Sequence, residues 1–144
     1  MDLADDRRST GVREEEVRSK VKAIHHIDVR KENIFLEPSC NPLLHDVITT
    51  CFCCESASQS IKNVANLLKS GGYLCMFGVL EQNSYRVRNF QFPSVNVKTE
   101  DIQSTITEIG FEILELKTLF NDEEFTSNTL TDSKNIYALF AKKL

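Results

Sequence analysis

The chain has 144 residues, of which 26% are charged and 41% hydrophobic, and its net charge is −4. This is enough for one domain with one core, and the negative charge without a basic stripe disfavours nucleic acid as a partner. The longest apolar run, near Tyr73 to Leu80, is too short to cross a bilayer, and the charged N-terminus lacks the apolar core of a signal peptide. We therefore expect a cytosolic chain without a membrane partner.

The first predicted elements are a helix and a short strand. Val17, Val21 and Ile24 recur at helical spacing, and three glutamates just before them lie in the expected first turn, where the helix dipole favours acids. Residues 23–29 then predict a short strand. Residues 31–44 contain the Asn, Pro and Ser residues that are typical of a loop.

The middle of the chain predicts a strand, a helix and a second strand. Residues 46–52 are nearly all apolar or β-branched, which is typical of a strand covered on both faces. Residues 61–68 carry one apolar helical stripe, and Gly71-Gly72 is predicted to end this helix with a left-handed turn. Tyr73 to Leu80 is predicted to be the next buried strand. A right-handed crossover would make the two strands parallel and adjacent.

The last third predicts a hairpin, a helix and two strands. Residues 82–98 alternate in polarity, with Asn89 as the turn. Residues 99–110 predict a helix that the threonine caps and the glycine ends. The strands predicted at 111–120 and 135–142 have no helix between them, so they can pair antiparallel, and the last is too apolar for a half-exposed edge. The order of the elements indicates an α/β fold.

The five cysteines do not match a disulfide framework or a metal site. An odd number, clustered in apolar segments, is unlike a secreted disulfide-rich domain. Cys51, Cys53 and Cys54 lack the Cys-x-x-Cys spacing, and the three histidines do not lie at matching intervals. On a strand, Cys51 and Cys53 would share one face. We expect these cysteines to pack in the core, because free cysteine is often buried.

Ligands of open α/β sheets bind beyond the carboxyl ends of the strands. The predicted strands end at Asp28-Val29, at residues 51–55 and at residues 78–85, so these three segments are expected at one edge of the sheet. His25 and His26 precede a strand end and are predicted to be structural.

Two runs in the middle of the chain resemble the second half of a class I S-adenosylmethionine-dependent methyltransferase. The run from Cys51 to Ala57, and the run from Gly71 to Leu80 followed by Ser84-Tyr85, resemble the nicotinamide, phenylethanolamine and indolethylamine N-methyltransferase family. Asp2-Leu3 and residues 13–29 extend this resemblance to nearly the whole chain. It implies a partial Rossmann-like sheet made of the C-terminal strands, with flanking helices and a terminal antiparallel pair.

The resemblance also implies a domain organisation and a function. Residues 1–144 would be one partial methyltransferase domain without the N-terminal glycine-rich half that binds the methionine end of the cofactor. The implied function is methylation of a small amine or pyridine, such as nicotinamide or an arylalkylamine, with S-adenosylmethionine as cofactor. The alternative is a truncated, non-catalytic paralogue or an incomplete gene model. Uncovered sheet edges would then favour self-association.

Three residues are implied in cofactor binding. Asp28 and Val29 match the position where a carboxylate meets the adenine amino group and an apolar neighbour packs on the ring. A carboxylate is a pure acceptor and the amine is a donor, so the chemistry fits, although a surface strand-end aspartate is the alternative. Cys51 takes a small-residue position beside the cofactor, where backbone contact is sufficient.

Three further residues are implied in substrate binding. Glu55 matches an acidic position near the amine, with a helix N-terminal acid as the alternative. Tyr85 matches a pocket aromatic that stacks on a flat substrate, with hairpin packing as the alternative. Ser94 aligns with a polar pocket position of the nicotinamide-specific relatives. We assign no catalytic residue, because aligning an activated sulfonium with its acceptor needs little proton chemistry.

The chain departs from both subgroups of the family at three positions. Gly78 stands where the nicotinamide enzymes carry an aspartate, and Gln82 stands where the amine enzymes often carry an acid. Thr131 lies at another position where an acid would be expected for amine binding. The clearest substrate determinants of either subgroup are therefore missing.

Overall fold

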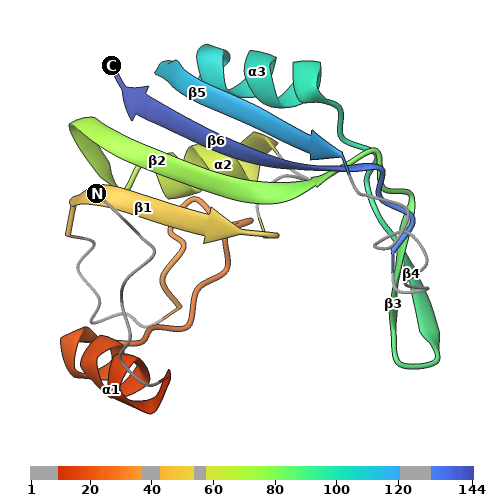
Figure 1. Ribbon diagram of the computed structural model, residues 1–144. Helices are drawn as coiled ribbons and strands as arrows, with labels where there is room; N and C mark the ends of the chain where they lie inside the picture. Colours follow the sequence, from red (N-terminus) through yellow and green to blue (C-terminus); the bar gives the residue numbers. More distant parts are fainter. Residues whose placement is uncertain (1–9, 37–42, 54–57, 121–130) are drawn as a thin grey trace.

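Four strands form a mixed sheet in the order β1-β2-β6-β5, and β3 and β4 form a separate hairpin (Figure 1). A computed structural model describes residues 10–36, 43–53, 58–120 and 131–144. The elements are α1 (Thr10–Lys20), β1 (His45–Cys51), α2 (Ser58–Ala65), β2 (Leu68–Leu80), β3 (Ser84–Val87), β4 (Phe90–Pro93), α3 (Thr99–Glu108), β5 (Phe111–Phe120) and β6 (Asn135–Lys143). The predicted α/β class is confirmed.

The strand pairing follows the predicted topology. β1 and β2 are parallel neighbours, with Cys51 opposite Phe77 at their carboxyl ends. β6 pairs antiparallel with both β2 and β5 and therefore lies inside the sheet, where its apolar sequence is expected. The hairpin has its turn between Val87 and Phe90, as the position of Asn89 predicted.

The core lies between one face of the sheet and the helices α2 and α3. Alternate β2 residues, among them Leu74 and Met76, are buried there together with Leu139 of β6. The helices contribute Ile61 from α2 and Ile106 from α3. This one-sided arrangement explains why each core strand buries every second side chain.

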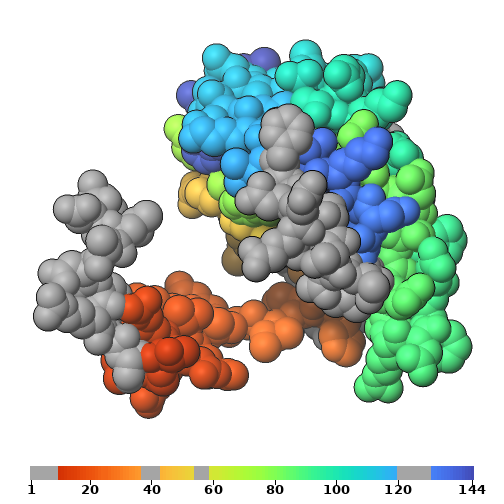
Figure 2. All heavy atoms as spheres, turned by 45° about the vertical axis from the view of Figure 1, so that its right-hand side comes forward, coloured from red at the N-terminus to blue at the C-terminus, as the bar shows by residue number. Residues whose placement is uncertain are grey.

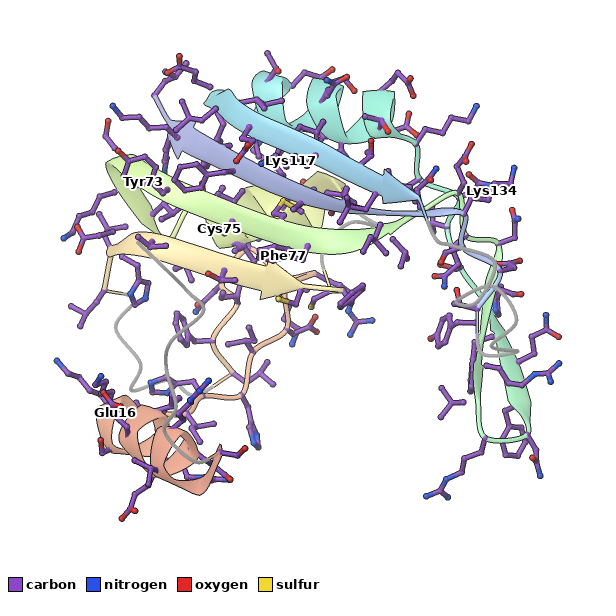
Figure 3. The ribbon with its side chains drawn as sticks, viewed as in Figure 1. Glu16, Tyr73, Cys75, Phe77, Lys117 and Lys134 are labelled. Carbon is purple, nitrogen blue, oxygen red and sulfur yellow. The ribbon has the colours of Figure 1, made fainter. Side chains whose placement is uncertain are left out.

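The other face of the sheet is open in the part of the chain that the structure describes. Figure 3 shows Tyr73, Cys75, Phe77 and Lys117 on the face turned away from α2 and α3. Phe77 is 42% exposed, and Tyr73 and Cys75 are half-buried. The prediction that β1 and β2 are covered on both faces is therefore wrong for the described residues, because both packed helices lie on the same side.

The region before β1 differs from the prediction. The helix is present as α1, but none of its residues is buried, and Val17 is exposed. Figure 2 shows α1, in red, set apart from the body of the molecule. The strand predicted at 23–29 is absent: Ile27 makes one isolated bridge to Phe35, and the Asp28 N–H donates to the Ile34 carbonyl at 2.8 Å. The backbone folds back on itself there instead of joining the sheet.

The end of α2 also differs from the prediction. The helix ends at Ala65 rather than at Gly71-Gly72, and β2 already begins at Leu68. Gly71 does adopt the left-handed conformation (φ +77°), but it does so inside β2. A Cβ at Gly72 would lie 3.0 Å from the Asp46 carbonyl oxygen of β1. Gly72 therefore allows β2 to approach β1 closely, while Gly71 provides the left-handed backbone beside it.

Two smaller predictions need correction. The N-cap of α3 is Lys98, one residue before Thr99, and its N–H donates to the Asp101 carboxylate at 2.9 Å. Cys51 and Cys53 are exposed, and Cys75 is half-buried, so core packing is wrong for these cysteines. The open sheet face and the end of β1 at Cys51 explain their exposure. Cys40 and Cys54 lie outside the described residues.

Candidate functional site

A pocket of about 420 Å³ lies where β1 and β2 end and the hairpin begins. Its lining comes from the residues after β1, the end of β2 and both ends of the hairpin. The lining residues are Phe52, Cys53, Val79, Gln82, Tyr85, Ser94 and Val95. The pocket therefore occupies the edge at which open α/β sheets bind ligands.

Both strands that lead to the pocket end in a left-handed residue. Phe52, directly after β1, has φ +52° and donates its N–H to the Phe77 carbonyl at 2.8 Å. Glu81, directly after β2, has the same φ and donates its N–H to the Val97 carbonyl at 2.9 Å. Such backbone is unfavourable for residues other than glycine and is often found at functional sites. The left-handed residues lie where the chain leaves β1 and β2, and Phe52 and Gln82 line the pocket there.

The aromatic wall of the pocket is Tyr85. It pairs with Phe92 across the hairpin, and the two rings stack with centroids 5.5 Å apart and planes 22° apart. Tyr85 also bridges Thr131, so the chain before β6 lies alongside β3. The ring is thereby supported on one face by Phe92 while 41% of the residue stays exposed.

Three polar side chains at the pocket are hydrogen-bonded in series. Ser94 Oγ donates to Gln82 Oε1 at 2.9 Å, and Gln82 Nε2 donates to Thr131 Oγ1 at 2.5 Å. The Ser94 N–H donates to the Asn83 carbonyl at 2.8 Å, which closes the base of the hairpin. Ser94, Gln82 and Thr131 thus join the hairpin, the end of β2 and the segment before β6.

The Asp132 carboxylate holds the start of the hairpin. It accepts hydrogen bonds from the Asn83 N–H at 2.9 Å and the Ser84 N–H at 3.0 Å, and from Ser84 Oγ at 3.2 Å. These donors, the Ser84 N–H foremost, lower the pKa of the Asp132 carboxyl. Asp132 is therefore a charged anchor for the backbone and is not among the residues that line the pocket.

The predicted adenine residues lie in a tight loop beside α2. Both carboxylate oxygens of Asp28 accept from Arg30, from Nε at 2.9 Å and from Nη2 at 3.0 Å. The Arg30 guanidinium, followed by its backbone N–H, lowers the pKa of the Asp28 carboxyl to about 2. The Val29 carbonyl accepts from Asn63 Nδ2 at 2.9 Å, and Asn63 is buried in α2. The loop is thus tied to the core helix.

The structure brings some of the predicted site residues together. Tyr85 and Ser94 line the same pocket, and Cys51 is the last residue of β1, next to lining residue Phe52. Asp28 and Val29 lie in a separate loop, and neither of them is among the described residues that line the pocket. Glu55 lies outside the described residues. The roles of all six remain predictions.

No individual role was predicted for four residues of the lining: Phe52, Cys53, Val79 and Val95. The first three fall in the segments 51–55 and 78–85 that were expected at the ligand-binding edge, whereas Val95 enters the lining through the fold of the chain after β4. No sequence pattern marks Asn63, because it does not lie at the spacing of the apolar stripe that Ile61, Val64, Ala65 and Leu68 form. Its partner lies 34 positions away, which no local pattern reveals.

The Asp28 loop suits the adenine end of S-adenosylmethionine in its chemistry. The Asp28 side chain is 18% exposed and ionised. Its Oδ1 accepts from both Arg30 Nε and the Arg30 backbone N–H, whereas Oδ2 accepts from Arg30 Nη2 and has a second lone pair for a ligand. Arg30 itself is 82% exposed, so water weakens its hold on Asp28. An amino group can therefore be accepted at Asp28 while Val29 packs against the core.

The described residues contain no group of three or more His, Cys, Asp and Glu side chains that could hold a metal ion. None of the described helices is long and apolar enough to cross a membrane.

Two solved structures of S-adenosylmethionine-dependent methyltransferases have a similar arrangement. One from Methanosarcina mazei has a TM-score of 0.59 and 15% identity, covering 81% of this chain and 65% of that one. A putative one from Listeria monocytogenes has a TM-score of 0.61 and 13% identity, covering 94% of this chain and 77% of that one. These likenesses show the fold, which is that of S-adenosylmethionine-dependent methyltransferases.

Curated relatives are N-methyltransferases. Phenylethanolamine N-methyltransferase of Mus musculus is 28% identical over 92% of this chain and 47% of that protein. Indolethylamine N-methyltransferase of Oryctolagus cuniculus is 28% identical (90% and 50%), and nicotinamide N-methyltransferase of Homo sapiens is 23% identical (99% and 55%). The chain spans about half the length of these relatives. The sequence model of the NNMT/PNMT/TEMT family matches residues 3–144, and the chain therefore belongs to this family.

Proposed function

We propose that the chain provides the acceptor pocket and the adenine end of the cofactor site of an S-adenosylmethionine-dependent N-methyltransferase. The acceptor is a small amine or pyridine. The observation that supports this most is the pocket at the ends of β1 and β2, which Tyr85 and Ser94 line together. Family membership and the methyltransferase fold support the same proposal.

The cofactor would supply an activated methyl group on its sulfonium. In this proposal Asp28 accepts the adenine amino group, Val29 packs on the ring and the backbone at Cys51 contacts the cofactor. Asn63 keeps the loop in place through the Val29 carbonyl. These residues bind and orient, and none of them moves a proton.

The acceptor would lie in the pocket against the Tyr85 ring. Phe92 supports that ring from behind, so its exposed face is a rigid wall for a flat molecule. Ser94 and Glu55 are proposed as further substrate contacts. Alignment of acceptor and methyl group is the main contribution to rate that we propose, because proximity alone supplies a large part of such accelerations.

The alternative is a truncated, non-catalytic paralogue or an incomplete gene model. The proposed location is the cytosol, which free cysteines such as Cys51 and Cys53 suit. Self-association through uncovered sheet edges stays a prediction, and sedimentation at several protein concentrations tests it.

Isothermal titration of S-adenosylhomocysteine into the 144-residue chain separates the two hypotheses. We expect weak one-to-one binding at the adenine end, lowered further in Asp28→Asn and unchanged in Asp101→Asn, which is remote from the loop. Absence of binding by a folded sample would favour the non-catalytic alternative. Sub-micromolar binding would show that the strand ends of this chain contact more of the cofactor than its adenine end.

A further inference from the structure

The open face of the sheet carries two neighbouring rows of side chains that run across all four strands. The register of the strands defines the first row, from β5 to β1: Glu115, Phe140, Cys75 and Thr49. The second row lies two residues further along each strand: Lys117, Ala138, Phe77 and Cys51. Figure 3 shows Cys75, Phe77 and Lys117 on this face.

The middle of both rows is apolar and accessible. Phe77 is 42% exposed and Phe140 is 37% exposed. Tyr73 extends the aromatic surface, because its ring stacks on that of Phe140 with centroids 5.2 Å apart and planes 10° apart. Neighbouring exposed apolar side chains of this size are typical of an interaction surface.

The charges of the two rows lie at one side, on the edge strand β5. Glu115 Oε1 and Lys117 Nζ are 2.6 Å apart, and their side chains are 56% and 68% exposed. Water therefore screens this pair in the single chain, and both groups remain accessible to a partner. An apolar centre with charges beside it is the usual composition of a protein interface.

The two rows are complementary to each other. An acid in the first row corresponds to a base in the second, at Glu115 and Lys117. A large side chain corresponds to a small one at Phe140 and Ala138, and the order of sizes is reversed at Cys75 and Phe77. A surface with two complementary halves can pack on a copy of itself, because a twofold axis brings each residue of one half against its counterpart.

Only one orientation of the axis satisfies the charges. Packed sheets keep their strands within about 30° of each other. A twofold axis perpendicular to the strands, between the two rows, places β5 over β5 of the partner and pairs Glu115 with Lys117 of the partner subunit twice. An axis along the strands would place β5 over β1, where Thr49 and Cys51 cannot neutralise the charges.

We propose that the open face binds a second copy of this chain about this axis and forms a dimer. The inference goes beyond the proposed function and does not depend on it. The contact involves four strands about 4.8 Å apart and a few residues of each, which is less than the roughly 800 Å² per partner of a stable complex. We therefore expect a dissociation constant in the tens of micromolar. Unfolding measurements on dilute protein report the monomer, whose face is open.

Sedimentation equilibrium of the 144-residue chain, from about 1 to about 500 µM, tests the dimer. Glu115→Lys and Lys117→Glu each bring like charges together twice and should weaken the dimer about tenfold. The double variant restores the pairing and should return the dissociation constant to within about twofold of the wild-type value. Glu108→Lys makes the same charge change on α3, on the other side of the sheet, and should leave it within about twofold.

An equimolar mixture of the two single charge variants provides an independent test. One variant then presents two lysines to two glutamates of the other, so the mixture should dimerise although each variant alone does so poorly. This recovery also shows that both variants are folded, which circular dichroism checks separately.

A further variant distinguishes packing of faces from pairing of edges. Two β5 edges joined side by side would also bring Glu115 near Lys117 of the partner subunit, so charge variants alone do not separate the two arrangements. Phe77 lies on β2, and β6 separates it from β5. Phe77→Ser should therefore weaken a dimer of faces by about tenfold and leave a dimer of edges unchanged.

Four results would overturn the inference. These are a monomeric wild-type chain over the whole concentration range, a dimer that folded single charge variants do not weaken, a double variant that stays monomeric, and a dimer that tolerates Phe77→Ser. A monomer would mean that the face is open or that another occupant covers it. Tolerance of Phe77→Ser would assign the association to the edges of the sheet.

Discussion

The side-chain amide of Asn63 donates a hydrogen bond to the Val29 carbonyl oxygen at 2.9 Å, although 34 positions separate the two residues. Gln59 Nε2 in turn donates to Asn63 Oδ1 at 2.8 Å, so the amide is oriented from within α2. Asn63 is 2% exposed. This contact is what holds the Asp28 loop against the core helix.

Replacing Asn63 should loosen that loop. Asn63→Ala leaves the Val29 carbonyl without its donor and is expected to lower the free energy of unfolding by about 1–3 kcal/mol. If the loop holds the adenine end, the affinity for S-adenosylhomocysteine falls as well. Urea unfolding and calorimetric titration measure the two effects. Asn66→Ala, at an exposed position after α2, is the control, and an equal loss in both variants would contradict the role of Asn63.

The Asp28 carboxyl should titrate unusually low. The Arg30 guanidinium is the main cause of its lowered pKa, about 2 instead of 3.8. Because the folded pKa lies below the unfolded one, the contact stabilises the fold above pH 3.8 and loses this effect as the pH falls toward 2. Arg30→Met should raise the pKa only in part, because the Arg30 backbone N–H also donates to Asp28. Carboxyl NMR titration measures it, with Arg86→Met as the control. An unchanged pKa in Arg30→Met would sink the assignment.

Lys143 should stabilise the end of α2. Its ammonium donates to the carbonyl oxygen of Ala65, the last residue of α2, at 3.0 Å and to that of Leu68, the first residue of β2, at 2.9 Å. The carbonyl groups at the end of a helix lack helical partners, so the lysine supplies a donor there. Lys143→Met is expected to lower the free energy of unfolding by about 1–3 kcal/mol in a urea titration. Lys142→Met, at the preceding residue of β6, should lower the free energy of unfolding by less than half as much. Equal losses would show that the carbonyl contacts matter little.

Neighbouring residues of β2 should differ sharply in their contribution to stability. Met76 is 1% exposed against the helices, whereas Phe77 is 42% exposed on the open face. Met76→Ala creates a cavity and is expected to cost about 2–5 kcal/mol, while Phe77→Ala should cost much less although it removes more atoms. Thermal and urea unfolding of the two variants provide the comparison. A larger loss for Phe77→Ala would mean that the open face is covered in solution.

Much of the fold follows from local patterns in the sequence. The alternation of residues 82–98 around Asn89 is sufficient for a hairpin, and Gly110 ends α3 where a left-handed residue is needed. The β1-α2-β2 unit gives the parallel pair because the helix between the strands returns the chain to the same end of the sheet. The absence of a helix between the last two strands allows their antiparallel pairing. Tyr85 and Ser94, which the resemblance to the family singled out, line the same pocket, and their role in substrate binding stays a prediction.

Tertiary contacts decided the rest. The sequences of β1 and β2 are apolar enough for burial on both faces. The exposure of each face nevertheless depends on the side of the sheet on which the helices pack. α2 ends where Lys143 donates to the Ala65 carbonyl oxygen and where Leu68 pairs with His45 in the sheet, whereas the glycines follow later, inside β2. A hydrogen bond at the pocket joins Gln82 to Thr131 across 49 positions. The sequence shows that both residues are polar, but it does not show that they are in contact. Local propensity reaches only a few residues, and long-range hydrogen bonds form only once the whole sheet is assembled.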